Sequence, residues 1–341
     1  MKVVIVGTDL NQQSDLKTQG QYLRDLLVSA GWNATIVSHF RNPLIRIFDT
    51  IIQILKLNKG DVIIVQVYST LGIYLEGLTV LTGWIKRTKI ISTLHGGDIP
   101  NAYRSNPIKH FILNTIIKHS NCITVPSTFI SKNIPLLENN HLLIHNYVNL
   151  NEYENKPKPN DIIRIFWMRS YHPTYDPLKA IKILEYIRAQ NIPAQLTMAG
   201  KDFGYLNEIL TYIKSSQYAK DISIHNVIDN KTKNELASQC TVYLCTNKID
   251  NAPVSFIEMM AMGLPIVTTN VGGIPYYVEN EKQAIISKDN SIEDMANLII
   301  QLHQNHELQN RIIANGITFS KTFSAEEVLK SWITILTNLH L

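Results

Sequence analysis

Residues 250–267 read DNAPVSFIEMMAMGLPIV, a short helix framed by residue types that start and stop helices. Asn251 is a residue type that caps helices, and Pro253 has a φ angle suited to the first turn. Gly263 ends the helix after about two and a half turns. Free backbone N–H groups at 252–255 should then point outward, where the helix dipole favours an anion. The stretch therefore predicts a site for a phosphate-bearing ligand.

Size and composition limit the class of protein. The 341 residues are 45% hydrophobic and 18% charged, which suits two α/β domains better than one ordinary core. The three cysteines lie in apolar contexts without CxxC spacing, so neither a disulfide framework nor a zinc site is expected, and a cytoplasmic location is favoured. The chain opens on a buried-strand pattern instead of a signal peptide, and no apolar run reaches the roughly 18 residues of a spanning helix.

Short apolar runs alternate with amphipathic, helix-length segments along the whole chain, as parallel sheets flanked by helices require. The sequence therefore predicts an α/β fold with two doubly wound, Rossmann-like domains. The expected strands are 3–6, 34–37, 62–65, 89–93, 122–125 and 142–144, then 163–167, 195–199, 222–225, 242–245, 265–268 and 284–286. The expected helices include 19–30, 177–190, 205–215, 231–239, the short helix that holds Glu258, 292–305 and 324–339.

A polar segment with two prolines, NEYENKPKPND at 151–161, can continue neither a strand nor a helix. We interpret it as the linker between an N-terminal domain at 1–150 and a C-terminal domain at 162–322. Residues 323–341 then form a last helix that is expected to pack back on the first domain. A hinge in the linker would let the two domains close over a ligand.

Charge is spread unevenly along the chain. Residues 1–150 hold 14 Lys and Arg against 8 Asp and Glu, whereas residues 151–341 hold 18 against 20, so the first half is the basic one. The excess is modest and lacks interleaved aromatic residues, so nucleic-acid binding is not indicated.

Segment 41–59 combines cations with large apolar residues, as in a helix that rests on anionic lipid. Its cations are Arg41, Arg46, Lys56 and Lys59. The simpler interpretation, which we adopt from the sequence, is a core helix with a solvated face. One helical stripe is apolar and could be buried by a sheet; it consists of Leu44, Phe48, Ile51 and Leu55.

Three linked motifs cover almost thirty residues around the opening stretch: Asp250-x7-Glu258, AMGLPIV at 261–267 and NVGGIP at 270–275. Together they resemble the donor-binding segment of retaining GT-B glycosyltransferases, in the large family numbered four (glycosyl transferases group 1). Further matches extend over most of the chain: HGGD at 95–98, VPS at 125–127, IHN at 144–146 and Arg169 at a strand end. The resemblance implies a GT-B fold, in which two Rossmann-like domains face a cleft. The C-terminal domain would hold a nucleotide sugar and the N-terminal domain the acceptor.

The resemblance also assigns roles to single residues. Glu258 would bind the ribose hydroxyls, and Arg169 would bind the diphosphate and compensate the charge that grows on the leaving group. Asp250 stands where family members usually have glutamate, at a contact with the transferred sugar. His95 would touch the donor sugar near its anomeric carbon. Ligands in open α/β sheets sit beyond the carboxyl ends of strands, where these residues and Gly200 are expected.

One position departs from the family pattern. Family members usually carry a lysine five or six residues after the arginine, whereas this chain has none before Lys179. His172, Tyr175 or Lys179 would then supply the donor group. Asp98 would orient His95 or bind the acceptor. The other donor-binding positions that we expect are Gly20, Asn251, Ala252, Pro253, Val254 and Ser255.

Two cofactor classes are not indicated. A dinucleotide site would need GxGxxG after the first strand, where the chain reads VGTDLN, so NAD binding is disfavoured. The chain has no Asp-x-Asp triplet with which a metal-dependent GT-A transferase would hold its cation. A helix start and Arg169 can replace the metal, so no metal is expected.

The sequence therefore predicts a retaining, metal-independent glycosyltransferase that moves a sugar from a UDP- or GDP-sugar to a hydroxyl acceptor. Assembly of cell-surface polysaccharide or glycolipid is the expected context, with a lipid-linked acceptor at the inner face of the membrane. Two alternatives stay open from the sequence. One is a GT-B epimerase or hydrolase that acts on the nucleotide sugar alone, and the other is a sugar-nucleotide-binding protein without activity.

Overall fold

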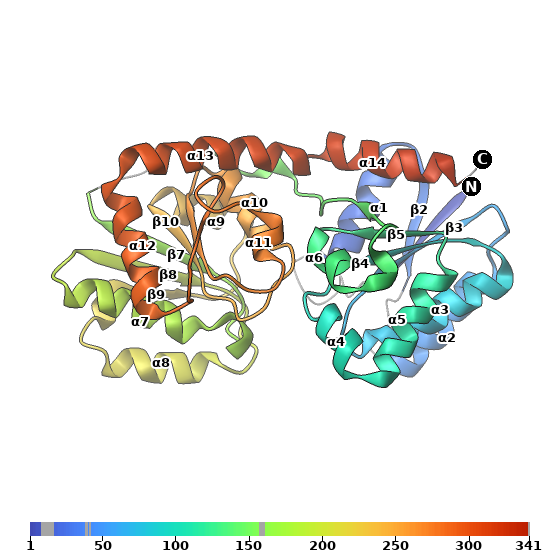
Figure 1. Cartoon of the computed structure of the whole chain (residues 1–341), viewed down its shortest axis with the longest axis horizontal. Helices are drawn as coiled ribbons and strands as arrows, with labels where there is room; N and C mark the ends of the chain where they lie inside the picture. The colour runs from blue at the N-terminus through green and yellow to red at the C-terminus, as the bar shows by residue number, and fades with distance from the viewer. Residues whose placement is uncertain (8–16, 38–39, 41, 157–160, 340–341) are drawn as a thin grey trace. The chain divides into compact units, whose positions relative to one another are not determined.

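The structure, a computed structural model, describes residues 1–7, 17–37, 40, 42–156 and 161–339. The chain divides into two compact units, one made of Met1–Tyr147 with Ala325–Leu341 and the other of Val148–Ser324. Each unit contains a six-stranded sheet with helices on both faces (Figure 1). The paired strands run parallel in both sheets. The prediction of two doubly wound α/β units is confirmed.

The first unit has the strand order β2-β1-β3-β4-β5-β6. Its strands are β1 (Lys2–Val6), β2 (Asn33–Val37), β3 (Val62–Val67), β4 (Lys89–Leu94), β5 (Cys122–Val125) and β6 (Leu142–Leu143). Its helices are α1 (Gln19–Ser29), α2 (Pro43–Leu55), α3 (Gly72–Lys86), α4 (Ile99–Ser105), α5 (Pro107–His119), α6 (Thr128–Asn133) and α14 (Ala325–Asn338). Every residue of β3 is buried, as expected for a central parallel strand covered on both faces.

The second unit has the order β12-β11-β10-β7-β8-β9. Its strands are β7 (Ile163–Met168), β8 (Ala194–Ala199), β9 (Ile222–His225), β10 (Val242–Cys245), β11 (Ile266–Thr268) and β12 (Ile285–Ile286). Its helices are α7 (Pro177–Ala189), α8 (Leu206–Ser215), α9 (Asn230–Ser238), α10 (Val254–Ala261), α11 (Ile274–Tyr277), α12 (Ile292–Gln304) and α13 (His306–Ser320). Separate apolar clusters cover its two faces, one with α7 and α12 and the other with α10.

The unit boundaries differ from the expected linker. The chain enters the second unit at Val148, and residues 151–156, which we assigned to the linker, pack inside that unit. The Glu154 N–H, for example, donates to Asn234 Oδ1 at 2.8 Å. Polar composition alone could not reveal these partners. Residues 157–160 of the expected linker lie outside the described residues. The last helix, α14, packs its Trp332 and Leu336 into the core of the first unit.

Helix α2 does not bury the stripe that the sequence suggested. Leu44 is 67% exposed, Phe48 68% and Leu55 51%, while the buried residues of the helix are Thr50 and Ile54. The interpretation of segment 41–59 as a core helix with a solvated polar face is therefore wrong. The helix turns a different side to the sheet because its apolar residues occupy more than one stripe. Arg41 of this segment lies outside the described residues.

None of the described helices is long and apolar enough to span a membrane.

Candidate active site

The candidate site lies at the carboxyl edge of the second sheet, where the strand order reverses. β7 pairs with β10 on one side and β8 on the other. In open α/β sheets, ligands bind beyond the strand ends at such a switch point. Arg169 follows β7, Gly200 follows β8, and the loop 246–253 follows β10.

Arg169 and Asp250 form an ion pair at this edge. Arg169 Nη2 lies 2.7 Å from Asp250 Oδ2, and the two side chains are only 16% and 18% exposed. Asn247 Nδ2 donates to the same carboxylate oxygen at 2.6 Å, and the guanidinium lies 5.5 Å from the centre of the Tyr175 ring. Burial opposes the charge of Arg169, but Asp250 more than offsets this effect and the pKa of the guanidinium is raised. Arg169 is therefore a permanent cation in a fixed position.

Three buried polar atoms around this ion pair have no hydrogen-bond partner within the described ranges. They are Arg169 Nε, Asn247 Oδ1 and Tyr277 Oη. Burial raises the pKa of Tyr277 well above its ordinary value and the Asp250 carboxylate adds to the rise, so the phenol stays protonated. Because buried polar groups in folded proteins are nearly always paired, these three atoms are candidate hydrogen-bonding partners for a ligand.

At this edge of the sheet, glycines let neighbouring backbone segments approach each other closely. A Cβ atom on Gly200 would lie 1.8 Å from the Arg169 carbonyl oxygen. Gly272 has a φ angle of +53°, and a Cβ atom there would lie 2.2 Å from the Asp250 carbonyl oxygen. The next N–H, that of Gly273, donates to the same carbonyl at 2.8 Å. The NVGGIP motif therefore holds the loop that carries Asp250.

We expect the substitution Gly200→Ala to displace Arg169. The added methyl group cannot fit against the Arg169 carbonyl, so the ends of β7 and β8 must separate. The expected result is a loss of about 1–3 kcal/mol in the free energy of unfolding and at least a tenfold lower kcat/KM. Gly60→Ala is the matched control, because a Cβ atom there meets nothing within 4 Å. Urea unfolding and initial rates measure both effects, and a Gly200→Ala protein with wild-type rates would contradict this placement of Arg169.

Helix α10 begins at Val254, and its N-cap residue Pro253 makes no side-chain cap hydrogen bond. The prediction of Asn251 as the cap is wrong. Asn251 and Ala252 are buried, so the expected exposed helix start is also wrong for this part of the stretch. The reason is that the Gly272–Gly273 turn packs on the backbone of Asp250 and Asn251. Of the other expected donor-binding residues, Ser255 is buried and Val254 is partly exposed.

The predicted end of this helix is confirmed. Gly263 follows the C-cap residue Met262 and has a φ angle of +69°, which favours glycine. The amide oxygen of Asn155 lies 2.2 Å from where a Cβ atom on Gly263 would be.

Glu258 lies in the second turn of α10 with two polar partners. Its Oε1 accepts the Tyr153 hydroxyl at 2.8 Å and lies 3.0 Å from Lys233 Nζ. The side chains of Lys233 and Glu258 are 9% and 13% exposed, and the ammonium lies 5.2 Å from the centre of the Tyr153 ring. Both contacts use Oε1, which leaves Oε2 for another donor. The sequence did not predict Lys233 or Tyr153, because they are 25 and 105 positions away and belong to no motif.

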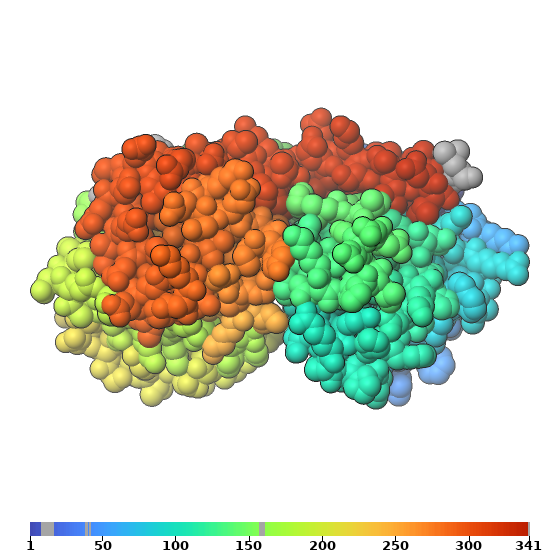
Figure 2. Space-filling view, viewed as in Figure 1, coloured from blue at the N-terminus to red at the C-terminus, as the bar shows by residue number. Residues whose placement is uncertain are grey.

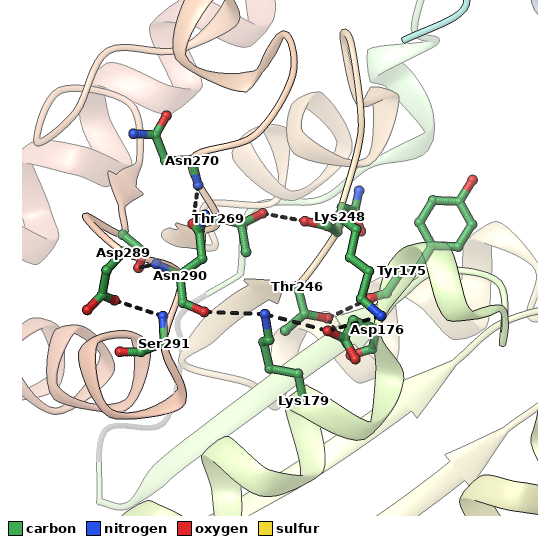
Figure 3. A network of polar contacts seen from close by, with 12 residues as sticks. Tyr175, Asp176, Lys179, Thr246, Lys248, Thr269, Asn270, Asp289, Asn290 and Ser291 are labelled. Carbon is green, nitrogen blue, oxygen red and sulfur yellow. Dashed lines mark hydrogen bonds and ion pairs between the residues drawn. The ribbon is translucent and has the colours of Figure 1, made fainter. Parts of the chain in front are cut away.

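Polar contacts connect the loops that follow β7, β10, β11 and β12 (Figure 3). Lys179 Nζ lies 3.3 Å from the Asn290 carbonyl oxygen and 3.5 Å from Asp176 Oδ2. Lys248 lies 3.6 Å from the same carboxylate but is 57% exposed, and its N–H donates to the Thr174 carbonyl at 2.8 Å. Lys248 is thus a second cation beside the loop that follows Arg169, and the sequence did not single it out.

His172 is the other predicted residue in the loop that follows Arg169. It is exposed, and its Nδ1 accepts the Thr174 N–H at 3.2 Å. This bond fixes the start of the turn that places Tyr175 beneath Arg169.

His95 belongs to the first unit, after β4. Its ring hydrogen-bonds Gln66 Oε1 and stacks on Tyr68 with a centroid distance of 5.4 Å. Burial lowers the pKa of His95 to about 4, although a hydrogen bond with Asn146 opposes the shift. The imidazole is therefore neutral at pH 7.

Two further predicted residues lie in the first unit. Asp98 Oδ1 accepts a hydrogen bond from Asn101 Nδ2 at 3.0 Å. Gln66 and Asn146 hydrogen-bond His95 and orient it, so Asp98 does not have the orienting role that the sequence suggested. Gly20 lies in the first turn of α1 and lines a pocket of about 240 Å³ that Gln66 and Tyr68 also line.

Glu76 is a buried residue of α3 whose carboxyl group contacts the backbone of Tyr68, the residue that stacks on His95. Its Oε2 accepts the Tyr68 N–H at 3.1 Å, and burial raises its pKa to about 8. Through Glu76 the folded protein binds up to one more proton than the unfolded chain between about pH 4.5 and 8, whereas neutral His95 acts in the opposite direction below about pH 6.5. We expect the Glu76 contribution to lower the free energy of unfolding with rising pH in this window by up to about 1.4 kcal/mol per pH unit. Glu76→Gln should remove this slope. Urea titrations of both proteins at pH 5.5, 7 and 8.5 measure it, and equal slopes would contradict the assignment.

Among the residues that the structure describes, no three His, Cys, Asp or Glu side chains form a candidate metal site. Metal independence nevertheless stays a prediction.

Two doubly wound units with a polar site at a switch point define the GT-B class, and solved structures share this fold. HepE from Anabaena, determined in complex with UDP and glucose, superposes with a TM-score of 0.76 at 14% identity, over 99% of both chains. Sucrose-phosphate synthase from Thermosynechococcus elongatus superposes with a TM-score of 0.79 at 16% identity, over 99% of this chain and 98% of that one. The predicted GT-B fold is confirmed.

Residues 150–319 match the family described as glycosyl transferases group 1, and the chain belongs to this family. It is 25% identical over 243 residues to an uncharacterized glycosyltransferase of Methanocaldococcus jannaschii, covering 70% of this chain and 65% of that protein. It is 22% identical over 266 residues to the N-acetyl-α-D-glucosaminyl L-malate synthase of Bacillus anthracis, covering 73% and 68%. A glycosyltransferase of Haemophilus influenzae matches at 29% over 28% of either chain.

Proposed function

We propose that this protein is a retaining, metal-independent glycosyltransferase that moves a sugar from a UDP- or GDP-sugar to a hydroxyl acceptor. The observation that carries the proposal is the buried Arg169–Asp250 ion pair at the switch point, inside the segment that matches the family. A planar guanidinium with an unpartnered Nε is well suited to bind a diphosphate. That HepE was determined with UDP and glucose supports a nucleotide-sugar donor.

Glu258 would bind the ribose of the donor. Its Oε2 can accept ribose hydroxyls while Oε1 remains bonded to Tyr153 and Lys233. These two residues position the carboxylate, and Lys233 places an opposite charge beside it. A nearly buried carboxylate needs such partners.

The chemical step that we propose is the one that the family resemblance implies. The bond between the anomeric carbon and the β-phosphate oxygen breaks, and Arg169 stabilises the charge that grows on the diphosphate. Lys248 adds a positive charge near the same loop. The acceptor hydroxyl attacks the anomeric carbon from the face that the diphosphate leaves, and its proton passes to the departing phosphate oxygen. The configuration is retained without a covalent intermediate. Asp250 would contact the transferred sugar once the diphosphate draws Arg169 away from it.

The neutral His95 has a supporting part in this proposal. It would contact the donor sugar and stabilise positive charge at the anomeric carbon through its dipole, and Gly20 would let the backbone approach the donor. A neutral imidazole suits this role, since a cation there would repel the developing charge.

The acceptor that we propose is a sugar or lipid-linked oligosaccharide of cell-surface polysaccharide or glycolipid assembly, at the inner face of the membrane. The basic first unit supports this context.

Calorimetric titration with UDP and with GDP tests the donor site. The proposal predicts binding of one of them in the presence of EDTA, with an affinity at least tenfold weaker in Glu258→Gln. Proton NMR of the product should then show the same anomeric configuration as the donor. Failure of both nucleotides to bind, or an inverted product, would contradict the proposal. Donor hydrolysis or epimerisation without any acceptor would favour the alternative reactions.

A further inference from the structure

Helix α2 presents apolar side chains to solvent instead of to the core. Its residues divide into three sectors: Thr50 and Ile54 face the sheet, polar residues such as Asp49 and Gln53 are partly covered, and large apolar residues point outward. The outward residues are Leu44, Ile45, Phe48, Ile52 and Leu55, all between 49% and 68% exposed. This is the reverse of an ordinary surface helix, whose outward sector is polar.

The same kind of surface continues on α3 and α5. Helix α3 packs beside both α2 and α5, and a Cβ atom on its Gly77 would lie 2.7 Å from the Ile112 side chain of α5. Trp84 of α3 contacts His119 of α5 edge to face. The exposed apolar residues of these two helices and the turn before α3 are Leu71, Tyr74, Leu78, Trp84, Ile85, Ile108 and Phe111. We call the outward side of α2, α3 and α5 the apolar face. The three helices belong to the blue to teal part of the chain in Figures 1 and 2.

Positive charge flanks the apolar face. The cations on the three helices and at their ends are Arg46, Lys56, Lys59, Lys86, Arg87, Lys109 and Lys118. Among the described residues the three helices contain two acids, Asp49 and Glu76. Glu76 is buried, so Asp49 is the one acid left near the surface. The face therefore combines exposed aromatic and aliphatic side chains with an excess of cations.

We propose that the apolar face docks the protein on the surface of an anionic lipid bilayer, with Phe48, Ile85 and Phe111 inserted among the lipid chains. Exposed apolar patches of this extent mark an interaction surface. Helices that lie in the membrane interface combine an apolar side with flanking lysine and arginine, which attract anionic headgroups. A second copy of the chain fits less well, because a twofold contact through this face would bring cations against cations.

Vesicle co-sedimentation of the full chain tests the proposal. The protein should bind vesicles of phosphatidylcholine with one third phosphatidylglycerol, and bind pure phosphatidylcholine at least tenfold more weakly. Raising the salt from 0.1 to 0.5 M should weaken binding to the anionic vesicles. The triple variant Phe48→Ser, Ile85→Ser, Phe111→Ser should lose at least tenfold in affinity. These side chains are exposed, so the variant should keep the wild-type circular dichroism spectrum.

The matched control is Phe203→Ser, which removes a residue of the second unit that is 58% exposed and should leave vesicle binding unchanged. The triple variant should also release nucleotide from a water-soluble donor at the wild-type rate, so the docking surface and the proposed reaction can fail separately. The proposal is overturned if the wild-type protein does not bind anionic vesicles, or if Phe203→Ser loses as much vesicle binding as the triple variant. It is also overturned if ultracentrifugation shows a dimer that the triple substitution dissociates.

Discussion

Replacing Arg169 by glutamine is expected to lower kcat about 10³-fold, the loss seen when one preorganised group that stabilises a charged transition state is removed. The side chain is nearly buried and carries a donor without a partner among the described residues. Glutamine keeps a hydrogen-bonding group near Asp250 but cannot compensate the charge of a departing diphosphate. Initial rates of nucleotide release at saturating donor measure the effect.

Arg188→Gln is the matched control for this experiment. Arg188 lies in the same unit and pairs with Asp221 at 2.9 Å, with a side chain that is 28% exposed. Asp221 directly precedes β9, so this pair lies at the amino end of that strand, away from the carboxyl edge that holds Arg169. It should change kcat less than twofold. Arg169→Lys should recover part of the lost rate, because it restores the charge without the planar fork. A wild-type rate in Arg169→Gln would show that this guanidinium does not stabilise the leaving group.

Replacing Glu258 by glutamine is expected to raise KM for the donor about 100-fold with a smaller change in kcat. A carboxylate that accepts ribose hydroxyls contributes charge-assisted hydrogen bonds of about 1.5–3 kcal/mol each, and a tenfold change corresponds to about 1.4 kcal/mol. Because the ribose is remote from the bond that breaks, its binding acts on the ground and transition states alike. The loss should therefore appear in KM.

Glu185→Gln controls for the loss of a partly buried carboxylate. Glu185 accepts the Tyr212 hydroxyl at 2.8 Å, much as Glu258 accepts that of Tyr153, but it lies on α7. KM should be unchanged in Glu185→Gln. Lys233→Met tests the positioning role, since it should raise KM while leaving kcat near the wild-type value. If Glu258→Gln and Glu185→Gln had the same KM, the ribose assignment would fail.

Much of the fold could be predicted because buried parallel strands appear in the sequence as short apolar runs. The expected strand 163–167, for example, corresponds to β7 at Ile163–Met168. Helix α3 was not identified, because its sequence GIYLEGLTVLTGWIK has almost no polar residues to reveal a helical period. Helix α2 was identified but placed with the wrong side inward. Its apolar residues fill most of its circumference, so the pattern could not show which sector meets the sheet.

The candidate site was predictable where a motif carries the residues and not elsewhere. Asp250, Glu258 and the glycines at 272 and 273 stand in motifs, and the structure explains the glycines through the close approach to the Asp250 carbonyl. Lys233 and Tyr153 could not be predicted from the sequence, because only the folded chain brings them to Glu258. The N-cap prediction at Asn251 failed for a similar reason: a turn more than twenty residues later packs on this segment.

The most direct test of the central claim is nucleotide release from a panel of UDP-, GDP- and ADP-sugars, measured in EDTA with wild-type protein, Arg169→Gln and Glu258→Gln. The account predicts that wild-type protein releases nucleoside diphosphate from at least one donor of the UDP or GDP class. Arg169→Gln should release it about 10³-fold more slowly, and Glu258→Gln should do so about 100-fold more slowly at low donor concentration. If no donor is consumed, or if both variants match the wild-type rate, the second unit does not hold the site described here.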